Sequence, residues 1–114
     1  MTDPAVLNIT IYQGADFSYD LKFPQDLSGF TVRAQGRETW ASTSTVWSSS
    51  TTASHLTISS ATSTQSVVQW RIPAATTAAF NTLEGVWDME LVSGGGAVDR
   101  VLKGSFYLDR EVTR

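Results

Sequence analysis

The stretch that decides the fold is residues 85–114, GVWDMELVSGGGAVDRVLKGSFYLDREVTR. Apolar and polar residues alternate along 85–91 and again along 101–108, and a Ser-Gly-Gly-Gly run separates the two arms. Strict alternation with a period of two is typical of a half-buried β-strand. Glycine adopts a positive φ without steric cost, so residues 93–96 suit a tight turn. The stretch therefore predicts an antiparallel β-hairpin.

The same alternation recurs in the rest of the chain. Strands are expected at 6–12, 16–23, 30–37 and 66–72, with a weak edge strand near 44–50 and a short strand near 55–59. A helical period occurs only at 74–80, which predicts a connector of about two turns that packs Phe80 under the strands. About seven to eight short strands, separated by turns, predict an all-β fold: an antiparallel immunoglobulin-like β-sandwich with one short helical connector.

Length and charge limit what kind of protein this is. A chain of 114 residues predicts one domain over 1–114, with 1–5 as an extended arm and 109–114 as a C-terminal arm. The net charge of −3 argues against nucleic acid as a partner, because a nucleic-acid binder needs a basic face. The chain has no cysteine, which excludes disulfides and thiolate chemistry. Residues 1–10 hold no apolar run typical of a signal peptide or a membrane span, so no membrane contact is expected.

Catalytic and metal-binding patterns are missing from the sequence. His55 is the only histidine and has no GxSxG motif or neighbouring carboxylate, so we expect a surface or loop histidine rather than a base. One histidine without cysteine excludes the usual zinc and copper sites. Asp88 and Glu90 share a strand face and are expected to pair with arginines on neighbouring strands rather than to form a catalytic pair. Those arginines are Arg33, Arg71 and Arg100. The sequence predicts a protein that is not an enzyme and needs no cofactor or metal.

Two groups of residues are candidates for a contact surface. Trp40 and Trp47 lie in the Ser/Thr-rich middle of the chain. If exposed, they would stack on sugar rings or dock against another subunit; if buried, they would close one end of the core. The second group is the charged end of the chain: Asp109, Arg110, Glu111 and Arg114. This end is either a solvated tail that frays or an arm that pairs with a neighbouring copy.

Several segments resemble small structural proteins of tailed phages. Residues 8–17, NITIYQGADF, are similar to their opening ITIEQGADF, and residues 26–37, DLSGFTVRAQGR, are similar to DLTGYTARMQIR. Residues 87–91, WDMEL, resemble YDLEL. Residues 98–106, VDRVLKGSF, followed by EVTR at 111–114, resemble VTRLLEGTF…EVTR.

This resemblance covers both ends of the chain in the right order, while residues 38–65 depart from it. Such proteins are encoded among phage tail genes and resemble the N-terminal sandwich of upper baseplate proteins. The resemblance implies a virion protein: a multi-copy β-sandwich module attached to tail, baseplate or fibre, whose partners are other virion proteins and copies of itself. One alternative is a decoration protein on the capsid of the head. A second alternative is a carbohydrate-binding module that contacts host surface glycans.

Overall fold

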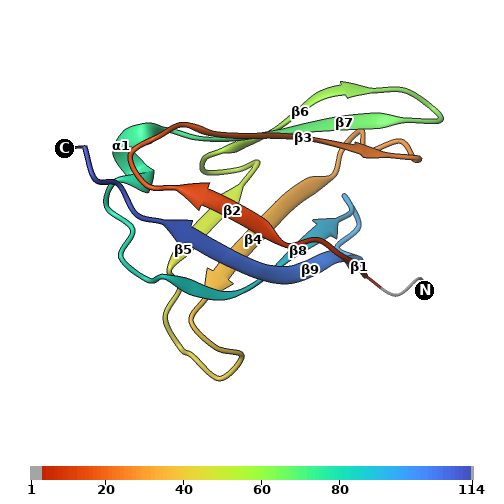
Figure 1. Cartoon of the computed structure of the whole chain (residues 1–114). Helices are drawn as coiled ribbons and strands as arrows, with labels where there is room; N and C mark the ends of the chain where they lie inside the picture. The colour runs from red at the N-terminus through yellow and green to blue at the C-terminus, as the bar shows by residue number, and fades with distance from the viewer. Residues whose placement is uncertain (1–3, 114) are drawn as a thin grey trace.

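The computed structural model describes residues 4–113 as two β-sheets that pack face to face (Figure 1). The larger sheet has the strand order β1-β9-β8-β4-β5, with β2 also pairing with β9. Its strands are β1 (Ala5–Val6), β2 (Ile9–Tyr12), β4 (Thr31–Arg37), β5 (Trp47–Ser50), β8 (Glu84–Val92) and β9 (Val98–Asp109). The smaller sheet has the order β3-β7-β6. Its strands are β3 (Phe17–Phe23), β6 (Leu56–Ala61) and β7 (Ser66–Ile72), and helix α1 (Ala74–Thr77) connects β7 to β8.

This strand order is that of an immunoglobulin-like sandwich. In variable-type immunoglobulin domains, one sheet contains strands G, F, C and C′, and the other contains A, B, E and D. The order β9-β8-β4-β5 corresponds to G-F-C-C′, and β3-β7-β6 corresponds to B-E-D. The predicted fold class is therefore confirmed. If β1 and β2 are counted as one interrupted strand, the described residues form eight strands, within the predicted number.

Strands β8 and β9 form the predicted hairpin. Trp87, Met89 and Leu91 face the core, and the residues between them lie on the other side of the sheet. Gly96 has a φ of 93° in the connecting turn, as expected for the glycine run. A bulge after Met89 shifts the register, so that Glu90 lies opposite Arg100.

The N-terminal strand differs from the prediction in direction, because it pairs with β9 in parallel rather than antiparallel. Ala5 lies opposite Leu102 and Ile9 lies opposite Phe106, so β1 and β2 continue one register. A period-two pattern shows which residues face the core and says nothing about which strand is the neighbour or how it runs. The segment predicted at 6–12 is thus a strand, but the sandwich is not wholly antiparallel.

The interruption between β1 and β2 has a local cause. The Leu7 carbonyl oxygen accepts a hydrogen bond from Nε1 of Trp87 at 2.9 Å. Beside it, Oδ1 of Asn8 accepts a hydrogen bond from the N–H of Ser105 at 3.0 Å. The N–H of Leu7 still donates to the Lys103 carbonyl at 2.8 Å, but a tryptophan from the core and an asparagine side chain bind the Leu7 carbonyl and the Ser105 N–H in place of backbone partners.

Tryptophan side chains form the centre of the core. The ring centroids of Trp70, from the smaller sheet, and Trp87, from the larger sheet, lie 5.3 Å apart. Trp47 lies 5.4 Å from Trp70 and 5.7 Å from Phe106. A side chain at Gly36 would collide with the Trp47 indole, so this glycine makes room for the ring. The cluster therefore joins the two sheets through direct aromatic contacts.

Helix α1 is shorter than the predicted helix at 74–80, since it ends at Thr77 and continues as turns. Thr77 is fully buried, and its hydroxyl accepts a hydrogen bond from the N–H of Gly14 and donates one to the Ala15 carbonyl. Threonine has a low helix propensity, and here its hydroxyl holds the turn between β2 and β3. Phe80 packs against the core as predicted.

The remaining strands lie close to their predicted places. The weak edge strand expected at 44–50 is β5, which begins only at Trp47, and the short strand expected at 55–59 is β6. Among residues 4–113, no helix has the length and hydrophobicity that a membrane crossing requires.

Two tryptophan replacements separate hydrogen bonding from packing in the core. Trp87→Phe removes the indole N–H that binds the Leu7 carbonyl, whereas Trp47→Phe removes an N–H that has no partner among the described residues. Both variants lose similar ring volume. We expect Trp87→Phe to lower the free energy of unfolding by about 1–3 kcal/mol more than Trp47→Phe does. Urea unfolding of the two variants measures this difference, and equal losses would show that the Leu7 bond contributes nothing to stability.

Candidate interaction surface

The structure separates the two tryptophans that the sequence placed together. Trp47 is only 5% exposed and lies inside the aromatic cluster, so the alternative of a core residue is confirmed for it and the alternative of a contact residue is wrong. It is buried because it points inward from β5, over Gly36. Trp40 is 70% exposed and lies on the loop between β4 and β5. Only Trp40 is therefore available to a partner.

The loop that carries Trp40 is held in a defined shape. The N–H of Thr39 donates to the Ser42 hydroxyl at 3.1 Å, and the N–H of Ser42 donates to the Thr39 carbonyl at 3.2 Å. Arg37 donates from Nη1 to the Ser42 carbonyl and from Nη2 to the Gln35 side chain, both at 3.1 Å. These bonds fix the loop on β4, so Trp40 projects from a braced turn.

A hollow of about 250 Å³ lies beside Trp40. Its lining residues are Gln35, Arg37, Thr39, Trp40, Val86, Trp87, Asp88 and Glu90. Most of these residues come from β4 and β8, on the side of the larger sheet that faces away from the smaller sheet. The hollow thus combines an exposed indole with amide, guanidinium and carboxylate groups.

We call that side of the larger sheet the outer face. It includes these outward-facing residues of four neighbouring strands: Tyr12, Arg33, Gln35, Arg37, Val86, Asp88, Glu90, Arg100, Lys103, Ser105, Tyr107 and Asp109. Tyr12 and Tyr107 are exposed large side chains on adjacent strands. Neither tyrosine was among the predicted contact residues, although the outward position of both in the alternating pattern would have revealed them.

Ion pairs cross the outer face between strands. Arg33 Nε lies 2.7 Å from Glu90 Oε1, and Arg100 Nη1 lies 3.8 Å from Asp88 Oδ2. The predicted pairing of Asp88 and Glu90 with arginines is therefore confirmed for Arg33 and Arg100. Arg71 lies on the smaller sheet and pairs with Asp20 at 2.7 Å.

The surroundings of Asp88 on this face disfavour its ionised form. Burial, and to a lesser degree the nearby Glu90 carboxylate, raise the pKa of Asp88 above its usual 3.8. Arg100, Arg37 and Arg33 act in the opposite direction without cancelling the effect. The carboxylate is thus partly desolvated where it stands, beside the hollow and Trp40.

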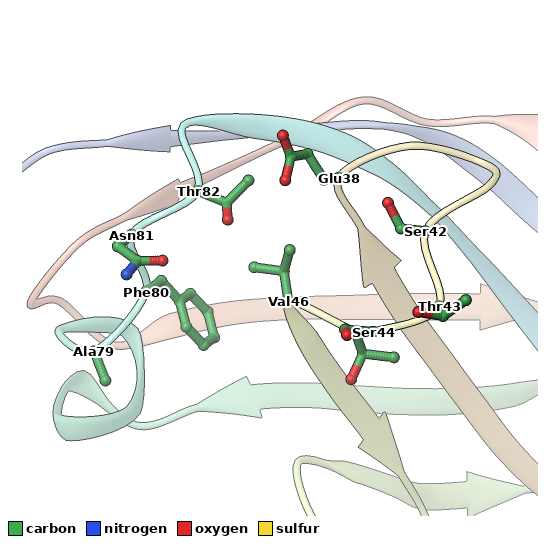
Figure 2. Close-up of a pocket in the computed structure, with 10 residues that line it drawn as sticks. Glu38, Ser42, Thr43, Ser44, Val46, Ala79, Phe80, Asn81 and Thr82 are labelled. Carbon is green, nitrogen blue, oxygen red and sulfur yellow. The ribbon is translucent and has the colours of Figure 1, made fainter.

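A second hollow, of about 450 Å³, lies on the other side of the same loop (Figure 2). Residues 42–46 and Glu38 form one wall, and residues 79–82 after α1 form the other. In Figure 2 the Phe80 ring is directed toward Val46, while Glu38 and Thr82 stand at one rim. Five of the ten lining residues carry hydroxyl groups, one carries a carboxylate and one an amide, which suits a polar ligand or ordered water.

The charged end of the chain is partly anchored to its own domain. Oε1 of Gln13 accepts a hydrogen bond from the N–H of Glu111, and Nε2 of the same side chain donates to the Phe80 carbonyl. Asp109 is the last residue of β9, and its carbonyl accepts a hydrogen bond from the N–H of Gln13. The arm expected at 109–114 is therefore tied down as far as Glu111. Arg110 is exposed, and Arg114 lies outside the described residues.

His55 lies in the turn before β6, as a loop histidine was expected to. It has a φ of 80°, and its Nδ1 lies 3.2 Å from the Ser49 hydroxyl. That hydroxyl also accepts the indole N–H of Trp70 at 3.1 Å, so His55 joins a network that holds the core. Within residues 4–113, no three His, Cys, Asp or Glu side chains gather closely enough to hold a metal ion.

Comparison with known proteins returns similarities to solved structures alone. No protein-family model matches the chain, and no curated protein sequence matches it. Among solved structures, the chain is similar to one described as the crystal structure of the ZIG-8–RIG-5 IG1–IG1 heterodimer, with 11% sequence identity and a TM-score of 0.39. The match covers 97% of this chain and 87% of that one.

The raised pKa of Asp88 predicts that replacing its carboxyl group will increase thermal stability by an amount that depends on pH. Because the folded state holds the Asp88 proton more tightly than the unfolded chain does, the ionised carboxylate costs stability once the pH exceeds the folded-state pKa. We expect Asp88→Asn to have a higher Tm than the wild type at neutral pH. The difference should shrink as the pH falls through the raised pKa and vanish below about 3.8. Thermal unfolding across this pH range measures it.

Asp26→Asn is a control for which we expect the opposite change in stability. Hydrogen bonds from the Ser28 hydroxyl and then the Ser28 N–H lower the pKa of Asp26, so its ionised form stabilises the fold. This variant should lose stability at neutral pH, and the loss should disappear as the pH falls through the lowered pKa. A lower Tm of Asp88→Asn than of the wild type at neutral pH would contradict the inference that the ionised Asp88 carboxylate lowers stability.

Proposed function

We propose that this protein is a non-enzymatic structural module of a tailed-phage particle, present in many copies, that binds other virion proteins through the outer face of its larger sheet. It acts by presenting a rigid surface rather than by chemistry. Its place is in the virion, at the tail, baseplate or fibre. Its partners are other virion proteins and copies of itself.

The observation that carries this proposal is where the phage-like segments lie in the fold. Residues 8–17 include β2, and residues 26–37 include β4. Residues 87–91 lie in β8, and residues 98–106 lie in β9. These four strands are neighbours in the larger sheet. The segments that resemble phage structural proteins thus build one continuous surface, while the divergent middle supplies the Trp40 loop, β5 and β6.

The chemistry of the outer face supports a protein partner. Trp40, Tyr12 and Tyr107 are exposed aromatic side chains, and tryptophan and tyrosine are enriched where proteins bind one another. Cationic and anionic residues alternate between them, notably Arg33 with Glu90 and Arg100 with Asp88. Mixed charges around aromatic anchors favour a specific, oriented contact.

Two measurements test the proposal. Mass spectrometry of purified particles, from the phage or induced prophage whose genome encodes the chain, should detect the protein; its absence from the particles would refute a virion role. Immunogold labelling or a particle reconstruction should place it at the tail rather than on the head. Labelling on the head would favour the decoration protein instead.

Trp40→Ala tests the role of the face itself. We expect the variant to enter particles at least about tenfold less than the wild type, with a nearly unchanged Tm, since Trp40 is exposed and truncating an aromatic hot spot costs about 2 kcal/mol or more at an interface. Val112→Ala is the control, because Val112 is 90% exposed and follows β9 rather than belonging to a strand of the outer face. Equal incorporation of both variants would exclude Trp40 from the contact.

The hollow beside Trp40 favours one second candidate, a carbohydrate-binding module that contacts host glycans. An exposed indole next to amide, guanidinium and carboxylate groups is an arrangement that binds sugar rings. In this case Trp40→Ala should abolish binding on a glycan array, and Arg37→Ala should weaken it. If neither variant changes glycan binding, or the wild type binds no glycan, this candidate falls.

A further inference from the structure

Strand β3 has an open edge, and this edge sets the protein apart from an ordinary immunoglobulin sandwich. In immunoglobulin domains, strand A pairs with strand B on this side of the smaller sheet. Here the N-terminal strand pairs only with β9, so β3, which corresponds to B, has β7 as its single neighbour among the described strands. Figure 1 shows β3 at the border of the smaller sheet, above β2.

The backbone groups that face this opening can be identified. The N–H of Arg71 in β7 donates to the His55 carbonyl on the β6 side. Since the N–H and C=O of one strand residue point to the same side, Arg71 does not bond to Ser18, which lies opposite it in β3. Successive residues of a strand direct their backbone groups to alternate sides. The N–H and C=O groups of Ser18, and therefore those of Asp20 and Lys22, point away from β7. Within residues 4–113, no backbone hydrogen bond outside the β3–β7 ladder involves these three residues.

The other sheet edges are protected in ways that β3 is not. Strand β6 contains a bulge between Ile58 and Ser60, and β5 has only four residues. The N-terminal edge is broken at Leu7 and Asn8. Strand β3 has seven residues without a bulge. Among the edges of the described residues it is the longest regular template for pairing with another strand.

We infer that β3 pairs antiparallel with β3 of a second copy, about a two-fold axis at Leu21, to form one continuous six-stranded sheet. In this register Asp20 lies opposite Lys22 of the second copy, and Lys22 lies opposite Asp20 of that copy. The backbone groups of these residues point to the open edge, so each opposed pair exchanges both of its backbone hydrogen bonds. An edge-to-edge contact of this kind is closed and isologous, as most dimer contacts are.

Charge complementarity selects this register over its neighbour. A two-fold axis at Asp20 would place two Asp20 carboxylates directly opposite each other, which is destabilising. The axis at Leu21 instead gives two cross-strand pairs of opposite charge. Lys22 is exposed and makes no ion pair among the described residues, while Asp20 already contacts Arg71 on β7 at 2.7 Å. The second copy would thus continue a row of alternating charges across the junction.

The inward side of the edge also suits a second copy. The axis places Leu21 against its own counterpart and Tyr19 against Phe23. Tyr19 shares the alternating face of Phe17 and Leu21, yet it is 38% exposed because the edge beside it is open. A hollow of about 290 Å³ between β2 and β3 borders Tyr19 and is lined by Ile9, Tyr12 and Phe17. Pairing would cover the aromatic ring that the open edge leaves exposed.

The contact is small, so it should be weak in dilute solution. A single pair of edge strands buries less than a standard stable interface, which places the dimer among transient contacts. Many copies held side by side in a particle would raise the effective concentration and make such a contact persistent. This inference goes beyond the proposed virion role and does not depend on it, because it concerns the purified protein.

Sedimentation velocity of the purified wild-type protein, from micromolar to millimolar concentration, tests the inference. We expect a concentration-dependent monomer–dimer equilibrium. Lys22→Glu and Asp20→Lys should each weaken it about tenfold or more, since each replaces two attractive pairs by two repulsive ones. An equimolar mixture of the two variants should dimerise again. In the mixed dimer, the Asp20 retained by one variant faces the Lys22 retained by the other, and the two introduced side chains, of opposite charge, face each other.

Arg110→Glu is the control, since it changes the net charge as Lys22→Glu does but is exposed and lies beyond the end of β9. It should leave the dimer unchanged, and far-UV circular dichroism with thermal unfolding should show that all variants are folded. A wild type that stays monomeric up to millimolar concentration would overturn the inference, as would a dimer that survives Lys22→Glu or a mixture that does not recover it.

Amide hydrogen exchange gives an independent readout. Dimerisation should slow the exchange of the Asp20 and Lys22 amides, which point to the open edge. The Tyr19 and Leu21 amides, which point to β7, should be protected in monomer and dimer alike. Slowing confined to the outer face of the larger sheet would show that copies meet there instead, and would also overturn the inference.

Discussion

The contact on which this structure depends is the one between Trp70 and Trp87, whose ring centroids lie 5.3 Å apart across the two sheets. Each tryptophan buries a large apolar area, and dispersion between so many atoms is collectively strong. Trp47 extends the contact to β5, and Phe17 extends it to β3 at 5.0 Å from Trp70. Because the chain contains no cysteine, no disulfide joins its sheets, and these rings hold the sandwich together.

The polar atoms of the same rings organise the chain around them. Nε1 of Trp87 donates to the Leu7 carbonyl and so positions the N-terminal strand on β9. Nε1 of Trp70 donates to the Ser49 hydroxyl, which also reaches His55 at the start of β6. Each buried N–H that finds a partner avoids a desolvation cost and at the same time fixes a distant segment. The core thereby determines where the edges of both sheets lie, and with them the surfaces that are open to partners.

The sequence predicted the parts of the fold that a period-two pattern encodes. The β8–β9 hairpin, β3, β4 and β7 were evident because apolar residues alternate along them without interruption. The burial of Trp47 was not evident, because the next inward residue of β5 is Ser49, which is buried through its bond to Trp70 and hides the alternation. The parallel direction of β2 was not evident, because alternation does not name a neighbour. The bond between Gln13 and Glu111, which anchors the end of the chain, joins residues far apart in sequence and leaves no local signal.

Of the candidate site, Trp40 could be proposed from residue type alone. The hollow beside it could not be predicted, because it forms only when β4 and β8 lie side by side.

The parallel pairing of β1 and β2 with β9 has a mechanical consequence. The chain enters this pair at Ala5, opposite Leu102, and leaves it at Asp109, opposite Tyr12. A force that pulls these two points apart would act along the strands and load the hydrogen bonds between them together, in shear, instead of opening them one after another. Resistance to forced unfolding is governed by the rate of the unfolding step, which such a geometry slows. A module strung between two attachment points would therefore transmit tension along its length while keeping its two sheets intact.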